Sequence, residues 1–169
     1  MDLDTEQFLQ EEFMNNSSTN GGLDKPLKYK AGSVIFAQGK PSKFLYIVLK
    51  GEVILLKMKG SNCTAIELCT EKDILNEVSV LTSSVNELTA VAKSDVELVL
   101  INQQDVVNII KNSPTWIPDI FKTLCERLKH TQQMIDEHNL AREKDTRLVI
   151  TKDDEKKYVK AFNDFLADT

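Results

Sequence analysis

The sequence predicts a mainly β domain, a sandwich or a barrel, that is followed by helices. Short apolar runs rich in β-branched and aromatic residues recur between residues 34 and 101, and turn residues separate them. After residue 101 the apolar positions change to a helical period. The chain has 169 residues, 41% of them hydrophobic, which is enough for one sizeable core and too little for two ordinary domains.

Six of the apolar runs are expected to be strands. In chain order they are VIFA (34–37), FLYIVL (44–49), EVILLKM (52–58), CTAIELC (63–69), LTAVA (88–92) and VELVLI (96–101). The turns between them come from Ala31-Gly32, Gly39-Lys40-Pro41, Lys50-Gly51 and Lys59-Gly60-Ser61-Asn62, the last of which suits a hairpin.

Two helices are expected after the strands. The first spans NQQDVVNIIKN (102–112), where Asn102 can cap the start and Ser113-Pro114 ends the helix. The second runs from about Thr115 to about Glu143. At about 1.5 Å per residue it would be on the order of 40 Å long, more than a small β domain can bury. Its distal half therefore needs a partner or stays solvated.

The long helix carries a broad apolar face of six residues, which are Ile117, Ile120, Phe121, Leu124, Cys125 and Leu128. A stripe with three-four spacing, typical of a dimer seam, consists of Leu124, Leu128, Thr131, Ile135 and His138. We therefore expect a homodimer through the helix at 115–143. The alternative is that Leu124 and Leu128 pack on the β domain, and both can hold for different halves of the helix.

Appendages flank this body. Residues 4–14 can form a short acidic helix with Phe8, Leu9 and Phe13 on one side, and NNSSTNGG then reads as a flexible linker. The tail at 144–169 predicts an amphipathic helix with Tyr158, Val159, Phe162, Phe165 and Leu166 at helical spacing. The expected division is thus 1–26, 27–143 and 144–169. Either appendage can cover the β domain, extend the dimer or recruit a partner.

Charge and composition exclude several classes of function. The net charge is -5. Five acids lie between residues 2 and 12, no Lys or Arg precedes residue 25, and residues 15–169 hold 21 acidic and 21 basic residues. The sequence has no basic patch of the kind that would indicate nucleic-acid binding. No apolar run reaches the length of a membrane span, and the acidic N-terminus does not resemble a signal peptide, so a cytoplasmic protein is expected. Cys63, Cys69 and Cys125 form no CxxC pair, which favours buried free thiols.

Several motifs carry a resemblance. They are AGxxIFxxGxP within YKAGSVIFAQGKPSKFLYIVLKGEV (29–53), the YIVxxGxV strand pair, DxxxE at Asp73–Glu77 and DVELxxI from Asp95. Together with the helix pair they resemble the cyclic-nucleotide-binding domain of catabolite-activator-type regulators, kinase regulatory subunits and gated channels. The resemblance covers roughly residues 27–143. It implies an eight-stranded, double-sheet jelly roll (β-roll) followed by a short and a long helix, the latter often pairing two protomers.

The family holds cyclic AMP or cyclic GMP in a cassette written approximately GDxFGE and, some eight residues later, PR[ST]A. Glycine there allows close backbone approach, glutamate accepts from the ribose hydroxyl, and arginine pairs with the cyclic phosphate. Matched by position, this chain has Lys72 and Asn76 for the glycines, Leu75 for the phenylalanine, and Val85, Asn86, Glu87 and Leu88 for PR[ST]A. Asp73 and Glu77 are kept. The candidate ligand positions are Asn76, Glu77, Val78, Asn86, Glu87 and Leu88.

These changes predict a cassette without its usual chemistry. Glu77 is a retained ribose contact or an ordinary loop carboxylate, and Glu87 adds repulsion where the phosphate would lie. Asn76 can still adopt a left-handed conformation. Leu88 and Val85 could fill part of a collapsed pocket. Lys57, Lys59 or Lys93 on neighbouring strands could compensate for the arginine, or could lie on a solvated outer face.

Catalysis has no support in the sequence. The two histidines, His130 and His138, lie eight residues apart on the long helix, so they do not form one metal site. Ser79, Ser83 and Ser84 lack a GxSxG elbow or a nearby histidine. We expect no enzyme, no metal and no resident cofactor.

The expected function is a stand-alone regulatory or scaffolding module of signal transduction that does not bind cyclic nucleotides in the usual way. The alternative is a sensor of cAMP, cGMP or another small ligand that uses a modified cassette and signals to a protein partner. The 26 residues after 143 have six basic and six acidic side chains and cannot hold a winged-helix DNA reader. Any link to transcription would therefore pass through a partner, and no direct contact with nucleic acid or membrane is expected.

Overall fold

The computed structural model describes residues 26–137 and 148–167. Its element order is β1 (Leu27–Tyr29), β2 (Val34–Phe36), β3 (Phe44–Lys50), β4 (Val53–Lys59), β5 (Asn62–Cys69), β6 (Ile74–Leu75), α2 (Glu77–Leu81), β7 (Thr89–Ala92), β8 (Val96–Asn102), α3 (Gln103–Lys111), α4 (Trp116–Glu137) and α5 (Lys152–Ala167). The predicted helix at 4–14 and the end of the long helix beyond residue 137 lie outside the described residues.

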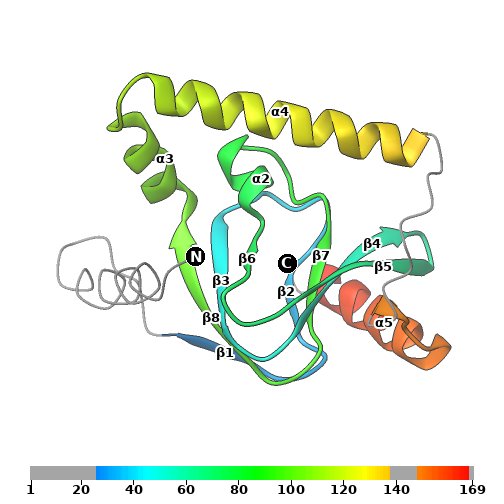
Figure 1. The fold of residues 1–169 in the computed structure, drawn as a ribbon. Helices are drawn as coiled ribbons and strands as arrows, with labels where there is room; N and C mark the ends of the chain where they lie inside the picture. Colours follow the sequence, from blue (N-terminus) through cyan, green and yellow to red (C-terminus); the bar gives the residue numbers. More distant parts are fainter. Residues whose placement is uncertain (1–25, 138–147, 168–169) are drawn as a thin grey trace.

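The eight strands form two four-stranded antiparallel sheets, in the orders β1-β8-β3-β6 and β2-β7-β4-β5 (Figure 1). This arrangement confirms the predicted double-sheet roll and all six predicted strands. Strands β1 and β6 were not expected from the sequence, because each is only two or three residues long and lacks an apolar run. Both pair at a sheet edge, where backbone hydrogen bonds to a longer neighbour define them.

Strand β4 shows why its sequence VILLKM is almost continuously apolar. Alternate residues point to opposite faces of a strand. Val53 and Leu55 pack in the interior of the roll, whereas Ile54, Leu56 and Met58 pack in a second cluster on the outer face. A strand that is buried on both faces needs apolar side chains at every position, and β4 is covered on its outer face by α5.

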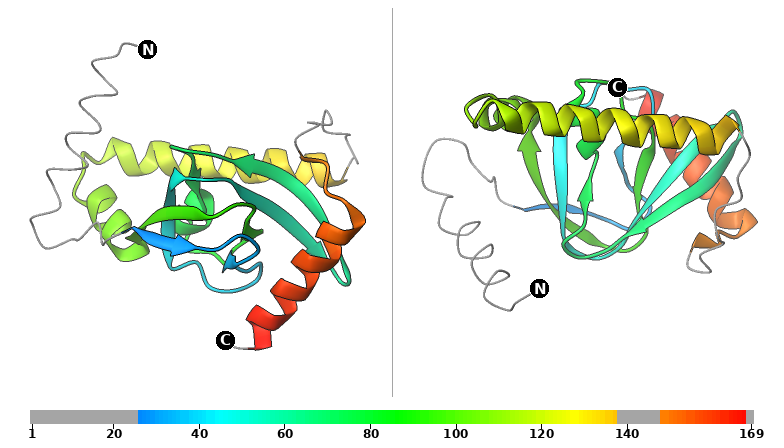
Figure 2. Two further views of the ribbon diagram at one scale, coloured as in Figure 1. Left: turned by 90° about the horizontal axis from the view of Figure 1, so that it is seen from below. Right: turned by 45° about the horizontal axis from the view of Figure 1, so that its top comes forward.

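Helix α5 confirms the amphipathic helix predicted for the tail and lies against the β4-β5 sheet (Figure 2). Tyr158, Val159 and Phe162 belong to the outer cluster. The backbone N–H of Cys63 donates to a Glu155 carboxylate oxygen at 3.2 Å, which ties the helix to β5. Of the roles left open for the tail, the structure therefore shows that it covers the roll.

Helix α4 runs across one end of the roll, with α2 between it and the sheets (Figure 1). The predicted Asn102 cap on α3 is confirmed, since its side chain accepts from the Gln104 N–H at 2.8 Å. Of the apolar face predicted for α4, only Cys125 is buried. Leu124 and Leu128 are 49% and 55% exposed, so the expectation that these two pack on the β domain is wrong. The roll ends beneath α2, and the outer side of α4 has nothing described to pack on.

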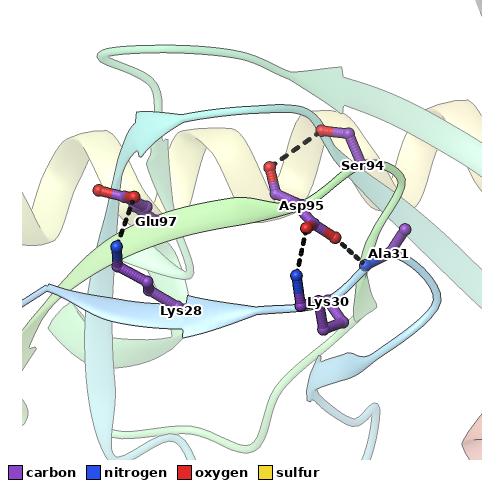
Figure 3. A network of polar contacts seen from close by, with 6 residues as sticks. All are labelled: Lys28, Lys30, Ala31, Ser94, Asp95 and Glu97. Atoms are coloured by element: carbon purple, nitrogen blue, oxygen red, sulfur yellow. Dashed lines mark hydrogen bonds and ion pairs between the residues drawn. The ribbon is translucent and has the colours of Figure 1, made fainter.

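Polar contacts bind β1 to β8 at the edge of the first sheet (Figure 3). Lys28 pairs with Glu97 at 3.1 Å, and Lys30 pairs with Asp95 at 2.6 Å. Asp95 also accepts from the Ala31 N–H at 3.0 Å, and the Lys30 contact holds the pKa of its carboxyl below the usual range. Exposed pairs of this kind contribute little individually, so they fix the path of the turn after β1 more than they stabilise the fold.

Candidate ligand-binding site

The structure gathers the predicted cassette at one cavity. A hollow of about 190 Å³ lies between β4, β5, β6, α2 and the start of β7. Five of the six candidate residues line it, namely Asn76, Glu77, Val78, Glu87 and Leu88. Asn86, which stands where the family has its arginine, is buried at 4% exposure and is not among the lining residues. The position that should supply the cation is thus turned into the protein.

Asn76 begins α2 in a left-handed conformation with φ 71° and ψ 16°, as the sequence predicted. Asparagine tolerates this region better than most residues, so the loop keeps a path that suits glycine. Lys72, at the other lost glycine, also has a positive φ of 74°. Both positions that the sequence matches to family glycines therefore have the left-handed backbone that glycine favours.

The Asn76 amide is held by the protein and not left for a ligand. Its Nδ2 lies 2.9 Å from Ser42 Oγ, 3.1 Å from the Phe44 carbonyl and 3.0 Å from Asn86 Oδ1. Two amide hydrogens are thus shared among three acceptors. Ser42 escaped the sequence analysis because it lies 34 residues from Asn76, and nothing in the local sequence signals that contact.

Asn86 joins three segments of the roll. Its Nδ2 donates to the Ala37 carbonyl at 3.1 Å, and its Oδ1 accepts from Asn76. Its backbone N–H donates to the Lys40 carbonyl at 2.9 Å, and its own carbonyl accepts from the Gly39 N–H at 2.8 Å. The side-chain amide and the backbone N–H and carbonyl of Asn86 thus all form hydrogen bonds within the protein. The residue thus connects the β2–β3 loop to the cassette.

The cavity has an acidic lining. Glu67, Glu77 and Glu87 line it, and no lysine or arginine is among its lining residues in the described part of the chain. Burial raises the pKa of the Glu77 carboxyl, hydrogen bonding by its own backbone N–H opposes that rise, and the charge of Glu67 adds to it. Burial, with Glu67, Asp73 and Glu77, also raises the pKa of the Cys69 thiol to about 12. Both shifts show that this end of the roll disfavours negative charge.

Lys57 is the one lysine of the three considered that lies near the cavity. It is half-buried on β4, and its Nζ donates to the backbone carbonyl of Glu87 at 3.3 Å. Lys93 instead pairs with Glu52 at 3.2 Å, and Lys59 is exposed at the end of β4. Lys57 is therefore the residue that could replace the missing arginine.

The size of the cavity limits what it can hold. Leu88 lines it, as the sequence suggested, but Val85 is 51% exposed and pairs with Pro41, so the expectation that Val85 fills the pocket is wrong. Its volume of about 190 Å³ is below the roughly 300–1,000 Å³ typical of small-molecule sites. The pocket is therefore small for a ligand site, although a cavity is present.

Other chemistry finds little support in the described residues. Among them no group of His, Cys, Asp and Glu could hold a metal, and none of the described helices is long and apolar enough to cross a membrane. Ser83 Oγ accepts from Gln103 Nε2 at 3.2 Å, and Ser84 Oγ lies 3.0 Å from Thr82 Oγ1. His130 is exposed on α4, and His138 lies outside the described residues. All three cysteines are free and buried, as predicted.

Known proteins share this fold and parts of this sequence. The model of the "Cyclic nucleotide-binding domain" family matches residues 26–113. The cyclic AMP receptor protein of Thermus thermophilus is 28% identical over 109 residues, which are 64% of this chain and 50% of that protein. The chain thus spans half the length of this relative.

Solved structures agree on the fold. The catabolite activator protein of Thermus thermophilus has a TM-score of 0.56 at 24% identity, over 76% of this chain and 59% of that one. The EAL enzyme Bd1971, in its cAMP- and cyclic-di-GMP-bound form, has a TM-score of 0.60 at 19% identity, over 69% of this chain and 32% of that one. Since the family model covers more than half of the sequence and the same residues form the roll, the chain belongs to the cyclic nucleotide-binding domain family.

Proposed function

We propose that this protein is a regulatory or scaffolding module whose cassette does not hold cyclic nucleotides in the usual way. The observation that carries the proposal is that the Asn86 side chain is buried. It forms hydrogen bonds with Ala37 and Asn76 at the position matched to the phosphate-binding arginine. The acidic lining by Glu67, Glu77 and Glu87 supports it. A cyclic phosphate would be desolvated beside carboxylates instead of beside a guanidinium.

The energetic consequence is large. Leaving a buried charge without its partner costs roughly 3–5 kcal/mol, which corresponds to about two to three and a half decades in affinity. Glu87 beside the same position adds repulsion to this loss. A cassette that binds its nucleotide at micromolar concentrations with the arginine in place would therefore, without the arginine, bind it only at millimolar concentrations or not at all.

The direct test is a titration of the full chain with cAMP and cGMP, read by thermal unfolding and by calorimetry. A ligand that binds only the native state adds about 2.7 kcal/mol of stability at 100 times its dissociation constant. We expect no saturable shift up to millimolar nucleotide. A saturable shift in the micromolar range would refute the proposal.

A matched gain-of-binding variant separates lost chemistry from a closed pocket. Asn76→Gly with Asn86→Arg and Glu87→Ser restores three of the family residues that this chain lacks in the cassette. We expect this variant to bind cAMP or cGMP at least about tenfold more tightly than the parent, because the arginine regains its anionic partner. The control, Glu71→Ser on an exposed turn, removes one charge and should bind no better than the parent.

The second candidate function is a sensor of cAMP, cGMP or another small ligand through altered contacts, and Lys57 favours it. Its Nζ already lies at Glu87, so a modest side-chain movement would bring the ammonium to the cavity. In that case the parent would show a saturable shift, and Lys57→Met would abolish it. The two functions therefore give opposite results in one titration.

We further propose that the module acts as a homodimer through α4 and signals to a protein partner. Ile120, Leu124 and Leu128 present a continuous apolar stripe at helical spacing, and each is 49% or more exposed. Exposed stripes of this kind are typical of interaction surfaces. With a net charge of -5, the chain does not favour direct contact with nucleic acid. We also propose a cytoplasmic location.

A further inference from the structure

An apolar groove of about 520 Å³ lies between helices α2, α3 and α4. Its floor combines Leu81 from α2, Val107 and Ile110 from α3, and Phe121 and Cys125 from α4. Phe121 is 41% exposed, so the described residues leave this part of the groove uncovered. The groove is distinct from the outer stripe of α4, because Ile120, Leu124 and Leu128 do not line it.

The rim of the groove is positively charged. Lys111 at the end of α3 and Lys122 on α4 line it, with Glu126 as the one acid. Neither lysine forms an ion pair with another residue of 26–137 or 148–167. An apolar groove with two lysines on its rim fits an amphipathic helix whose polar side is acidic.

The chain itself contains such a segment outside the described residues. DTEQFLQEEFM (4–14) has no basic residue, and its sequence predicts a helix with Phe8, Leu9 and Phe13 on one side. At 100° per residue, Glu6 and Glu12 lie at or within this apolar side, whereas Asp4 and Glu11 lie on the opposite one. The segment therefore matches the groove in both apolarity and charge.

The connecting chain is long enough. Residues 15–26 are 12 residues, which span up to about 40 Å when extended. Leu27 pairs with Leu98 on β8, and α3 begins five residues further along, at Gln103. Five strand residues extend about 17 Å, so the groove lies well within reach of residue 14.

We propose that residues 4–14 dock as an amphipathic helix in the groove of their own chain, with Leu9 and Phe13 against its floor and Glu6 and Glu12 toward Lys111 and Lys122. The groove backs onto α2, which begins at the cassette residue Asn76, so docking would hold the cassette helix against α3 and α4. The inference concerns a different surface from the cavity and does not depend on whether a nucleotide binds.

The test is hydrogen exchange of the full chain, read on peptides from α3 and the first half of α4. Glu6→Lys with Glu12→Lys reverses the charges that face the rim, and we expect exchange of residues 105–125 to rise about threefold, the effect of two exposed ion pairs. Lys111→Glu with Lys122→Glu should give the same rise. Combining all four substitutions should return exchange toward that of the parent, because the pairs re-form with opposite polarity.

The matched control is Asp4→Lys with Glu11→Lys, which makes the same charge change on the other side of the predicted helix and should leave exchange unchanged. Leu9→Asp with Phe13→Asp removes the apolar contact and should give a larger rise than either charge reversal. The proposal is overturned if this variant leaves the groove peptides unchanged, or if the four-fold variant is no better protected than the double ones. Protection of the α3 peptides, which lie outside the α4 stripe, that depends on protein concentration would also overturn it, since the occupant would then belong to a second copy.

Discussion

The side-chain amide of Asn76 donates to the side-chain oxygen of Asn86 at 3.0 Å, and the sequence motif predicts that these two positions correspond to a glycine and the phosphate-binding arginine of the family. Each asparagine also bonds a second segment, Asn76 to Ser42 and Asn86 to Ala37. Positions that serve a ligand in other members thus connect three loops of the protein here. The polar side chains of this loop therefore satisfy one another and their neighbours within the protein.

The contact between Asn76 and Asn86 should contribute measurably to the free energy of unfolding. Asn86→Ala leaves the Ala37 carbonyl without this donor and removes one of the three acceptors of the Asn76 amide, and we expect a loss of about 1–3 kcal/mol in the free energy of unfolding. With Asn76→Ala as the second change, a double-mutant cycle read by urea denaturation should give a coupling of at least about 0.5 kcal/mol. Additive losses would show that the contact between the two side chains contributes no stability.

Two glycines offer a matched test of the turns. Gly51 has φ +92°, and a Cβ there would lie 2.4 Å from the Asp95 carbonyl oxygen and 2.7 Å from Val96 Cγ1. Gly51→Ala should therefore cost about 3 kcal/mol or more, from strain and collision together. Gly60 has φ +59° with nothing within 4 Å, so Gly60→Ala should cost only about 1 kcal/mol. Equal losses in thermal unfolding would mean that the space around Gly51 does not decide its identity.

The raised pKa of Glu77 predicts a pH dependence of defined sign. A carboxyl with a folded-state pKa above its unfolded value binds protons more tightly when folded, so its contribution favours folding at low pH. That contribution is lost as pH rises from the ordinary glutamate value through the raised one. Glu77→Gln should therefore be more stable than the parent at pH 7, with a smaller difference at pH 4.

Denaturation midpoints at the two pH values measure this effect as a difference between variant and parent. Glu71→Gln serves as the control, because it removes an exposed charge from a neighbouring turn. A Glu77→Gln protein that is less stable than the parent at neutral pH would assign the carboxylate a favourable contact in the folded state.

The proposed dimer makes a prediction about α4. Leu124→Asp with Leu128→Asp places charges in the exposed stripe and should weaken self-association at least about a hundredfold, as measured by sedimentation equilibrium. Ile109→Asp is the matched control, since Ile109 is 69% exposed on α3 and does not belong to the stripe. If the double variant remains dimeric, the interface lies elsewhere.

The periodicity of the sequence by itself determined six of the eight strands, the two helices that follow them and the tail helix, whereas the arrangement of the strands as a roll was implied by the family resemblance. Runs such as EVILLKM and the Asn102 cap act through neighbours in the sequence, and such local signals can be read without coordinates. The motifs also determined which six residues form the candidate cassette, five of which line one cavity.

Tertiary structure alone decided the rest. It buried Asn86 against Ala37 and Asn76 and brought Lys57 to the Glu87 carbonyl. These hydrogen bonds join residues that are 10 to 49 positions apart in the sequence. It also left Val85 exposed. It also left Leu124 and Leu128 exposed, because the side on which they lie depends on where α4 crosses the roll. Local sequence specifies which side chains are available, whereas the packing of distant segments decides which polar groups satisfy one another and which are left for a ligand.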